Sequence, residues 1–133
     1  MLLALGSCGS DSAPAPSALP VSGSWKVSQV VQGGGATCGE GGALALTQSG
    51  ASLAGTFNAR GACETSSIAV DFVRSGNVEA GSVNGTAIHV TLGVCQYSGT
   101  LVGNPPTLVS GSVTCTGLPA TSGALLGSWE ASH

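Results

Sequence analysis

Residues 38–63 read CGEGGALALTQSGASLAGTFNARGAC, and this stretch decides the fold. Gly50-Ala51 has the Gly-X form of a two-residue turn, which joins antiparallel strands in tight β-hairpins. If Ser49–Ser52 closes the hairpin, Cys38 and Cys63 fall directly opposite each other at its open end. Directly opposed strand residues lie within disulfide distance, so this register predicts a Cys38–Cys63 bridge.

A second hairpin places another cysteine pair in the same way. Asn104-Pro105-Pro106 is the predicted turn, with Gly103 facing Thr107. Counting outward along both arms brings Cys95 opposite Cys115. Four cysteines allow three pairings, and the two registers together select this one. Zinc would favour close CxxC pairs, which the sequence lacks, so we expect no metal.

The rest of the chain repeats short strand patterns separated by turn residues. Asn84-Gly85 is a strong hairpin signal, and Ser75-Gly76 predicts a further turn. Eight to nine strands at hairpin spacing predict an all-β fold, most simply an antiparallel up-and-down barrel, with a β-sandwich as the alternative. The predicted strands are 22–31, 43–49, 52–59, 67–73, 77–83, 86–92, the arms around 104–106, and 125–132.

Composition excludes several classes of function. Charged residues make up 7% of the chain, and its net charge is −3. The cations Lys26, Arg60 and Arg74 are scattered, so no basic patch for nucleic acid is present. No apolar run reaches the length of about 20 residues that a transmembrane helix needs. We expect a monomer.

The N-terminus predicts export and anchoring. Leu5-Gly6-Ser7-Cys8 resembles the lipobox of bacterial lipoproteins, in which the cysteine carries the lipid after cleavage of the signal peptide. The resemblance implies a truncated signal peptide at 1–8, a flexible Ser/Ala/Pro linker at 9–20 and a β domain at 21–133. It also implies contact with a lipid bilayer through Cys8 and a place in the bacterial cell envelope, facing the periplasm or the exterior, which agrees with disulfide formation.

A Gly-Ser/Thr-apolar motif recurs along the strands. Because strand side chains alternate, its glycine faces inward, where it suits a small, strongly coiled barrel. Gly23-Ser24-Trp25 resembles the G-x-W motif of calycins, the lipocalin and avidin-like barrels, in which the Trp packs across the closed end. By that resemblance, Trp129 of Gly127-Ser128-Trp129 lies beside Trp25 in the closed barrel. Other copies are Gly55-Thr56-Phe57, Gly81-Ser82-Val83, Gly85-Thr86-Ala87, Gly99-Thr100-Leu101 and Gly111-Ser112-Val113.

The polar residues show no nucleophile-base-acid arrangement. His89 alternates with apolar neighbours and is predicted to face solvent, and His133 is predicted to be disordered. Glu79 shares the predicted inner face with Val83, and Arg74 is its nearest partner by sequence. We therefore expect neither an enzyme nor a cofactor.

Two further carboxylates follow the first cysteine pair. Glu40 and Glu64 could approach each other through that bridge, but they are interpreted mainly as solvated loop charges.

The leading functional hypothesis is a tethered, non-enzymatic barrel that binds a small apolar ligand in its lumen. The first alternative is a structural or adhesive envelope module without a small-molecule ligand. A weaker alternative is a protease inhibitor that presents the loop Gly33–Gly42 as bait. The lumen is predicted to be lined by Trp25, Val27, Leu44, Leu46, Phe57, Ile68, Val70, Ile88, Val90, Leu101 and Trp129.

The lipoprotein hypothesis predicts what the DNA upstream of Met1 encodes. The apolar stretch before Cys8 is shorter than the roughly 7–15 residues of a signal-peptide core, and it carries no Lys or Arg. We expect an in-frame upstream extension that supplies both an apolar segment and a basic start. An upstream sequence without such a frame would contradict lipidation of Cys8.

Overall fold

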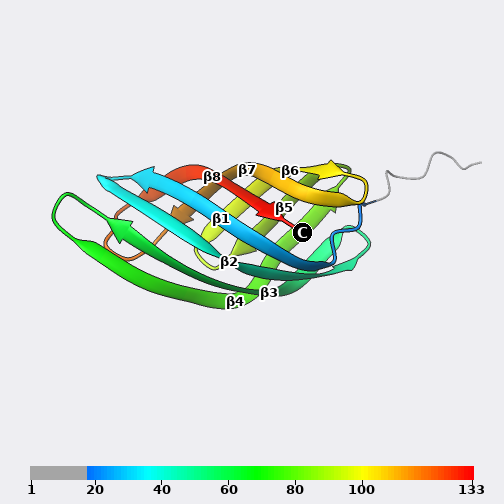
Figure 1. The fold of residues 1–133 in the computed structure, drawn as a ribbon, viewed down its shortest axis with the longest axis horizontal. Helices are drawn as coiled ribbons and strands as arrows, with labels where there is room; N and C mark the ends of the chain where they lie inside the picture. The colour runs from blue at the N-terminus through cyan, green and yellow to red at the C-terminus, as the bar shows by residue number, and fades with distance from the viewer. Residues whose placement is uncertain (1–17) are drawn as a thin grey trace, which may run out of the picture.

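The computed structural model describes residues 18–133 as eight antiparallel strands in one closed barrel. Cys8 and most of the predicted linker lie outside the described residues. Figure 1 shows the strands wound around a common core, with β1 running away from the end at which the C-terminus lies. The strands are β1 (Gly23–Gly33), β2 (Ala36–Ser49), β3 (Ser52–Glu64), β4 (Ala69–Asn84), β5 (Ala87–Leu92), β6 (Cys95–Gly103), β7 (Pro106–Thr116) and β8 (Ala124–Ser132).

Each strand pairs with its neighbours in the chain, and β8 closes the barrel by pairing with β1. This confirms the predicted up-and-down barrel over the sandwich. The strand order follows from sequence pattern, because short connections leave consecutive strands adjacent and antiparallel. The pairing of β8 with β1 then closes the sheet. The closing seam runs from Lys26, opposite Ser132, to Gln32, opposite Leu126.

Both predicted disulfides are present, and both cysteine registers are confirmed. Cys38 opposes and bonds Cys63, and Cys95 opposes and bonds Cys115. The tip of the second hairpin differs from the prediction, since Gly103 pairs with Pro106 rather than with Thr107. A register shift after Val102 shortens the turn, and the Asn104–Pro105 peptide is cis.

The predicted turn at Ser75-Gly76 is wrong. β4 continues through both residues, which leaves eight strands and not nine. Gly76 is in the strand for another reason: a Cβ there would lie 3.3 Å from the Phe57 ring, so the missing side chain makes room for that ring.

An irregularity further along β4 corrects the placement of Glu79. The register with β5 shifts between Glu79 and Ser82, and Ala80 has a φ of 48°. This bulge resets the alternation, so Val78 and Val83 are both buried and Glu79 is exposed. Glu79 therefore does not face inward, and simple two-residue counting fails at this point.

The predicted bait loop is also wrong. Gly33 pairs with Ala36, so only Gly34 and Gly35 form a turn, and the rest of Gly33–Gly42 belongs to strands. Both turn glycines have positive φ, at 57° and 79°. A protease-binding loop of the predicted length is therefore not available here.

Motif glycines inside strands, such as Gly99 and Gly111, alternate with buried side chains and so face the interior, whereas Gly85 lies in the turn between β4 and β5. A Cβ at Gly99 would lie 2.9 Å from the Trp129 indole, so Gly99 makes room for that ring. The predicted neighbour of Trp129 is wrong, however, because it opposes Gln29 on β1 and not Trp25. Trp25 instead packs edge-on against His133, at 4.8 Å between ring centroids, so His133 is ordered on the barrel end.

The disulfides predict how stability responds to their removal. Each bridge closes a loop of 20 to 25 residues, for which the chain-entropy model gives about 3 kcal/mol. We expect Cys95→Ala/Cys115→Ala to lower the free energy of unfolding by about that amount in urea titrations. Non-reducing peptide mapping of the unmodified protein should return 38–63 and 95–115, and any other pairing would overturn the register.

Candidate functional site

The barrel interior holds a polar cluster among its apolar side chains. Gln29, Glu40, Arg74 and Tyr97 come from four different strands, β1, β2, β4 and β6, and each lies at an inward position. Glu40 shares its strand face with Cys38, two residues away. The cluster is thus fixed by the same register that joins the disulfides.

Arg74 is the centre of this cluster. Its Nε and Nη2 atoms each donate to one Glu40 carboxylate oxygen at 2.6 Å, forming a bidentate ion pair. Its Nη1 donates to the Leu92 carbonyl at 2.7 Å. The guanidinium also lies over the Phe57 ring, 5.2 Å from the centroid.

Tyr97 and Gln29 connect the ion pair to the second disulfide. Arg74 Nη2 donates to the Tyr97 hydroxyl at 3.3 Å, and that hydroxyl donates in turn to Gln29 Oε1. Gln29 Nε2 faces the Cys115 Sγ at 3.5 Å. Within residues 18–133, no buried side-chain nitrogen or oxygen lacks a hydrogen-bond partner.

Burial sets the protonation of this cluster. Burial raises the pKa of Tyr97 to about 12, and the Glu40 carboxylate adds to the rise, while Arg74 opposes it. Burial alone would lower the pKa of Arg74, but hydrogen bonding to Glu40 and its charge outweigh that effect and raise it. The phenol stays neutral and the guanidinium stays charged at ordinary pH. The arrangement is that of a satisfied structural ion pair.

Sequence reasoning missed this cluster. Glu40 was interpreted as a solvated loop charge and Arg74 as a partner of Glu79, and both interpretations are wrong. The Glu40 side chain is 5% exposed and pairs with Arg74, whereas Glu64 is exposed at the strand end. The signal was available, because a two-residue step from Cys38 places Glu40 inside the barrel.

Most of the predicted lumen residues pack against one another in the barrel core, and Trp25 and Val27 also line the larger concavity described below. The space bounded by Val27, Leu44, Phe57 and Tyr97 has a volume of about 10 Å³, close to the room one water molecule needs. Ile68 is wrongly placed in the lumen, because it lies in the turn before β4 and is 53% exposed. Val27 and Val70 are partly buried, and the buried members are Trp25, Leu44, Leu46, Phe57, Ile88, Val90, Leu101 and Trp129.

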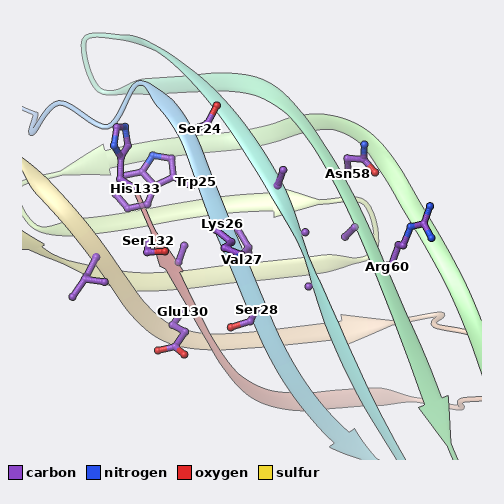
Figure 2. Close-up of a pocket in the computed structure, with 16 residues that line it drawn as sticks. Ser24, Trp25, Lys26, Val27, Ser28, Asn58, Arg60, Glu130, Ser132 and His133 are labelled. Carbon is purple, nitrogen blue, oxygen red and sulfur yellow. The ribbon is translucent and has the colours of Figure 1, made fainter.

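A larger concavity lies at the barrel wall, and it is lined by outward side chains and by the core residues Trp25, Val27 and Ala131. It is an open groove of about 1090 Å³ that crosses β8, β1, β2 and β3. Its floor is Gly41–Ala43, where β2 presents almost no side chain. Lys26 and Ser28 of β1 stand on one side of this floor, and Asn58 and Arg60 of β3 stand on the other (Figure 2).

Strand register explains how these side chains come together. Lys26 opposes Ala43, which opposes Asn58 on the next strand. Gly41 opposes Arg60 in the adjacent row. Because neighbouring strands lie about 4.8 Å apart, the walls stand roughly 10 Å from each other at the backbone.

The far side of the groove is formed by β8 and the start of β7. Glu130 opposes Ser28, and Ser132 opposes Lys26. Leu108, which opposes Ser132, adds an apolar side chain that is 52% exposed. The groove thus combines hydroxyl groups, two cations, one carboxylate and an apolar rim.

Three further observations bear on the range of functions. No helix that could cross a membrane occurs in residues 18–133. In the same residues, no group of three or more His, Cys, Asp or Glu side chains is placed to hold a metal ion. His89 lies at the partly exposed outer face, with Nδ1 3.0 Å from the Ser98 hydroxyl.

Comparisons with known proteins give little more. No protein-family model matches the chain, and no curated protein sequence matches it. Among solved structures, it is similar to the S-type phycobiliprotein lyase CPES from Guillardia theta, with 12% identity over 83% of this chain and 85% of that one, and a TM-score of 0.40. At this level the likeness bears on no residue and no activity of this chain.

The raised pKa of Tyr97 predicts a loss of stability in alkali. The pKa of Tyr97 is about 12 in the folded state, against 10.0 when unperturbed. The contribution of Tyr97 to the free energy of unfolding is therefore complete below pH 10 and disappears as the pH rises toward 12. The free energy of unfolding should fall by about 2–3 kcal/mol across that window.

Ultraviolet titration can follow this change directly, because Tyr97 is the single tyrosine of the chain. Tyr97→Phe is the control for all other titrating groups and should lack this component of the fall. A folded-state phenol that ionises near its ordinary pKa would contradict the burial argument.

Proposed function

We propose that the protein is a non-enzymatic module of the bacterial cell envelope that binds acidic polysaccharide through the groove over β8, β1, β2 and β3. The observation that carries the proposal is the position of the free cations. Lys26 and Arg60 both line this groove, whereas Arg74 forms an ion pair with Glu40. Within residues 18–133, the Arg74–Glu40 contact is the one ion pair.

The chemistry of the groove suits an extended sugar chain with carboxylates. Ser24, Ser28, Ser132 and Asn58 offer hydroxyl and amide groups that can exchange hydrogen bonds with sugar hydroxyls. Lys26 and Arg60 can pair with carboxylates on either side of a floor without bulky side chains. An open groove of this kind accommodates a polymer that continues past both ends.

The alternative site, the barrel lumen, supports a ligand less well. An apolar ligand there would have to displace packed side chains, since the space bounded by Val27, Leu44, Phe57 and Tyr97 has a volume of about 10 Å³. Native mass spectrometry of gently extracted protein should accordingly show no retained lipid or pigment. A bound apolar molecule would favour the lumen hypothesis instead.

Anchoring through Cys8 is part of the proposal and rests on the lipobox resemblance. The described chain begins packing near Val21, which is fully buried and whose amide donates to Gln48 Oε1 at 2.8 Å. The domain would therefore be held close to the start of β1. The groove begins at the same end of the barrel, where Ser24 and His133 are among its lining residues.

The groove proposal predicts opposite effects for its two kinds of charge. Binding of polygalacturonate, measured by calorimetry, should weaken about 2–5-fold in Lys26→Gln and in Arg60→Gln, because exposed ion pairs contribute up to about 1 kcal/mol. Glu130→Gln should strengthen it, and Glu64→Gln, an exposed carboxylate outside the groove, should leave it unchanged. The affinity for neutral dextran should be the same for all variants and for the unmodified protein.

Added salt should weaken binding to polygalacturonate, since the contacts are exposed. Equal affinity of the unmodified protein and of Lys26→Gln/Arg60→Gln for the acidic polymer would overturn the proposal.

A further inference from the structure

The first half of β4 has a partner strand on one side only. β4 runs over Ala69–Asn84, but β5 is much shorter and begins to pair with it only at Val78. On the other side, β3 pairs with β4 from Ala69 onward. Figure 1 shows β4 along the lower margin of the barrel, with β3 beside it. Residues Ala69–Asn77 therefore form a free strand edge.

This edge lacks the features that usually protect one. Free edges offer unpaired backbone N–H and C=O groups, and proteins block them with Lys, Pro or inward charges. The segment AVDFVRSGN contains neither Lys nor Pro, and its inward Arg74 is neutralised by Glu40. Val73 is 66% exposed, and Ile68 beside the segment is 53% exposed. Asp71 is the one exposed charged side chain of this segment, and an edge of this length suits strand addition.

We propose that this edge pairs antiparallel with the same segment of a second copy of the chain, about a twofold axis at Val73. The sequence pattern alone led us to expect a monomer. The free segment extends four residues to either side of Val73, so this register pairs all nine of its residues. Pairing between two barrels would then satisfy backbone groups that are open in one barrel.

The length of the free segment favours the register at Val73, and charge argues against some of the alternatives. With Val73 opposite its own copy, Asp71 faces Ser75 of the partner subunit, and no two like charges oppose each other. A register centred on Asp71 would instead place two carboxylates face to face, which destabilises a strand pair.

The dimer does not depend on the proposed polysaccharide function. The edge belongs to β4, whereas the groove crosses β8, β1, β2 and β3. The two features meet at one place, because Val73 opposes Arg60 across β3 and β4. Substitutions at Lys26, on the distant wall, therefore test the groove without touching the edge.

Sedimentation velocity over a concentration series tests the dimer. The unmodified protein should change from monomer to dimer as concentration rises. Val73→Asp places two carboxylates opposite each other at the axis and should raise the dimer dissociation constant at least about tenfold. Within one subunit the new carboxylate lies beside Arg60, so the fold should persist, which circular dichroism checks.

Leu126→Asp is the matched control. Leu126 is 64% exposed, like Val73, but it is paired on both sides, by Gln32 and by Thr114. This variant should dimerise as the unmodified protein does. So should Lys26→Gln, even if it loses polysaccharide binding, which separates failure of one proposal from failure of the other.

A mixing experiment tests the register itself. Val73→Asp and Val73→Lys should each be monomeric alone, whereas an equimolar mixture should form a heterodimer, because opposite charges then meet at the axis. A monomer at every concentration of the unmodified protein would overturn the proposal. So would a dimer that survives in Val73→Asp, or a mixture of the two variants that stays monomeric.

Discussion

The cross-strand register of the two disulfide-bonded hairpins is the constraint on which the rest of this structure depends. A shift of one residue would carry every side chain of a strand to the opposite face. With Cys38 opposite Cys63 and Cys95 opposite Cys115, that shift is excluded in both halves of the barrel. The same register brings Glu40 and Tyr97 inside, where Arg74 joins them. The ion pair and the bridges therefore require the same arrangement of the strands.

Much of the fold followed from local pattern. The turn at Gly50-Ala51, the alternation along the strands and the symmetric cysteines sufficed to predict the barrel and both bridges. The predictions failed where the chain departs from strict alternation. At Ala80 a bulge turned Glu79 outward, and at Gly76 a glycine serves packing and not a turn. A single sequence does not distinguish a glycine in a turn from a glycine that makes room for a ring, because both can have the same neighbouring residues.

The candidate sites were harder to predict than the fold. The groove joins residues of β8 with residues of β1, β2 and β3, so it exists only after the barrel closes. The groove depends on the absence of side chains at Gly41 and Gly42. Nothing in the sequence distinguishes these two glycines from the others. The interior was predicted to be roomier than it is. Inward glycines do not leave a lumen empty, because Trp129 and Phe57 fill the space that Gly99 and Gly76 leave.

The placement of the two bridges has a mechanical consequence. The chain enters the barrel near Val21, beside the C-terminal His133, whereas Cys38–Cys63 lies toward the opposite end of β1, across from Val31. Tension between the N-terminal segment and a polymer held on β1 and β2 would pass through the near end of these strands only. The bridges lie outside that load path. Under such a load, resistance to pulling would rest on the hydrogen bonds that join β1 to β2 and β8, whereas the bridges restrict the unfolded chain.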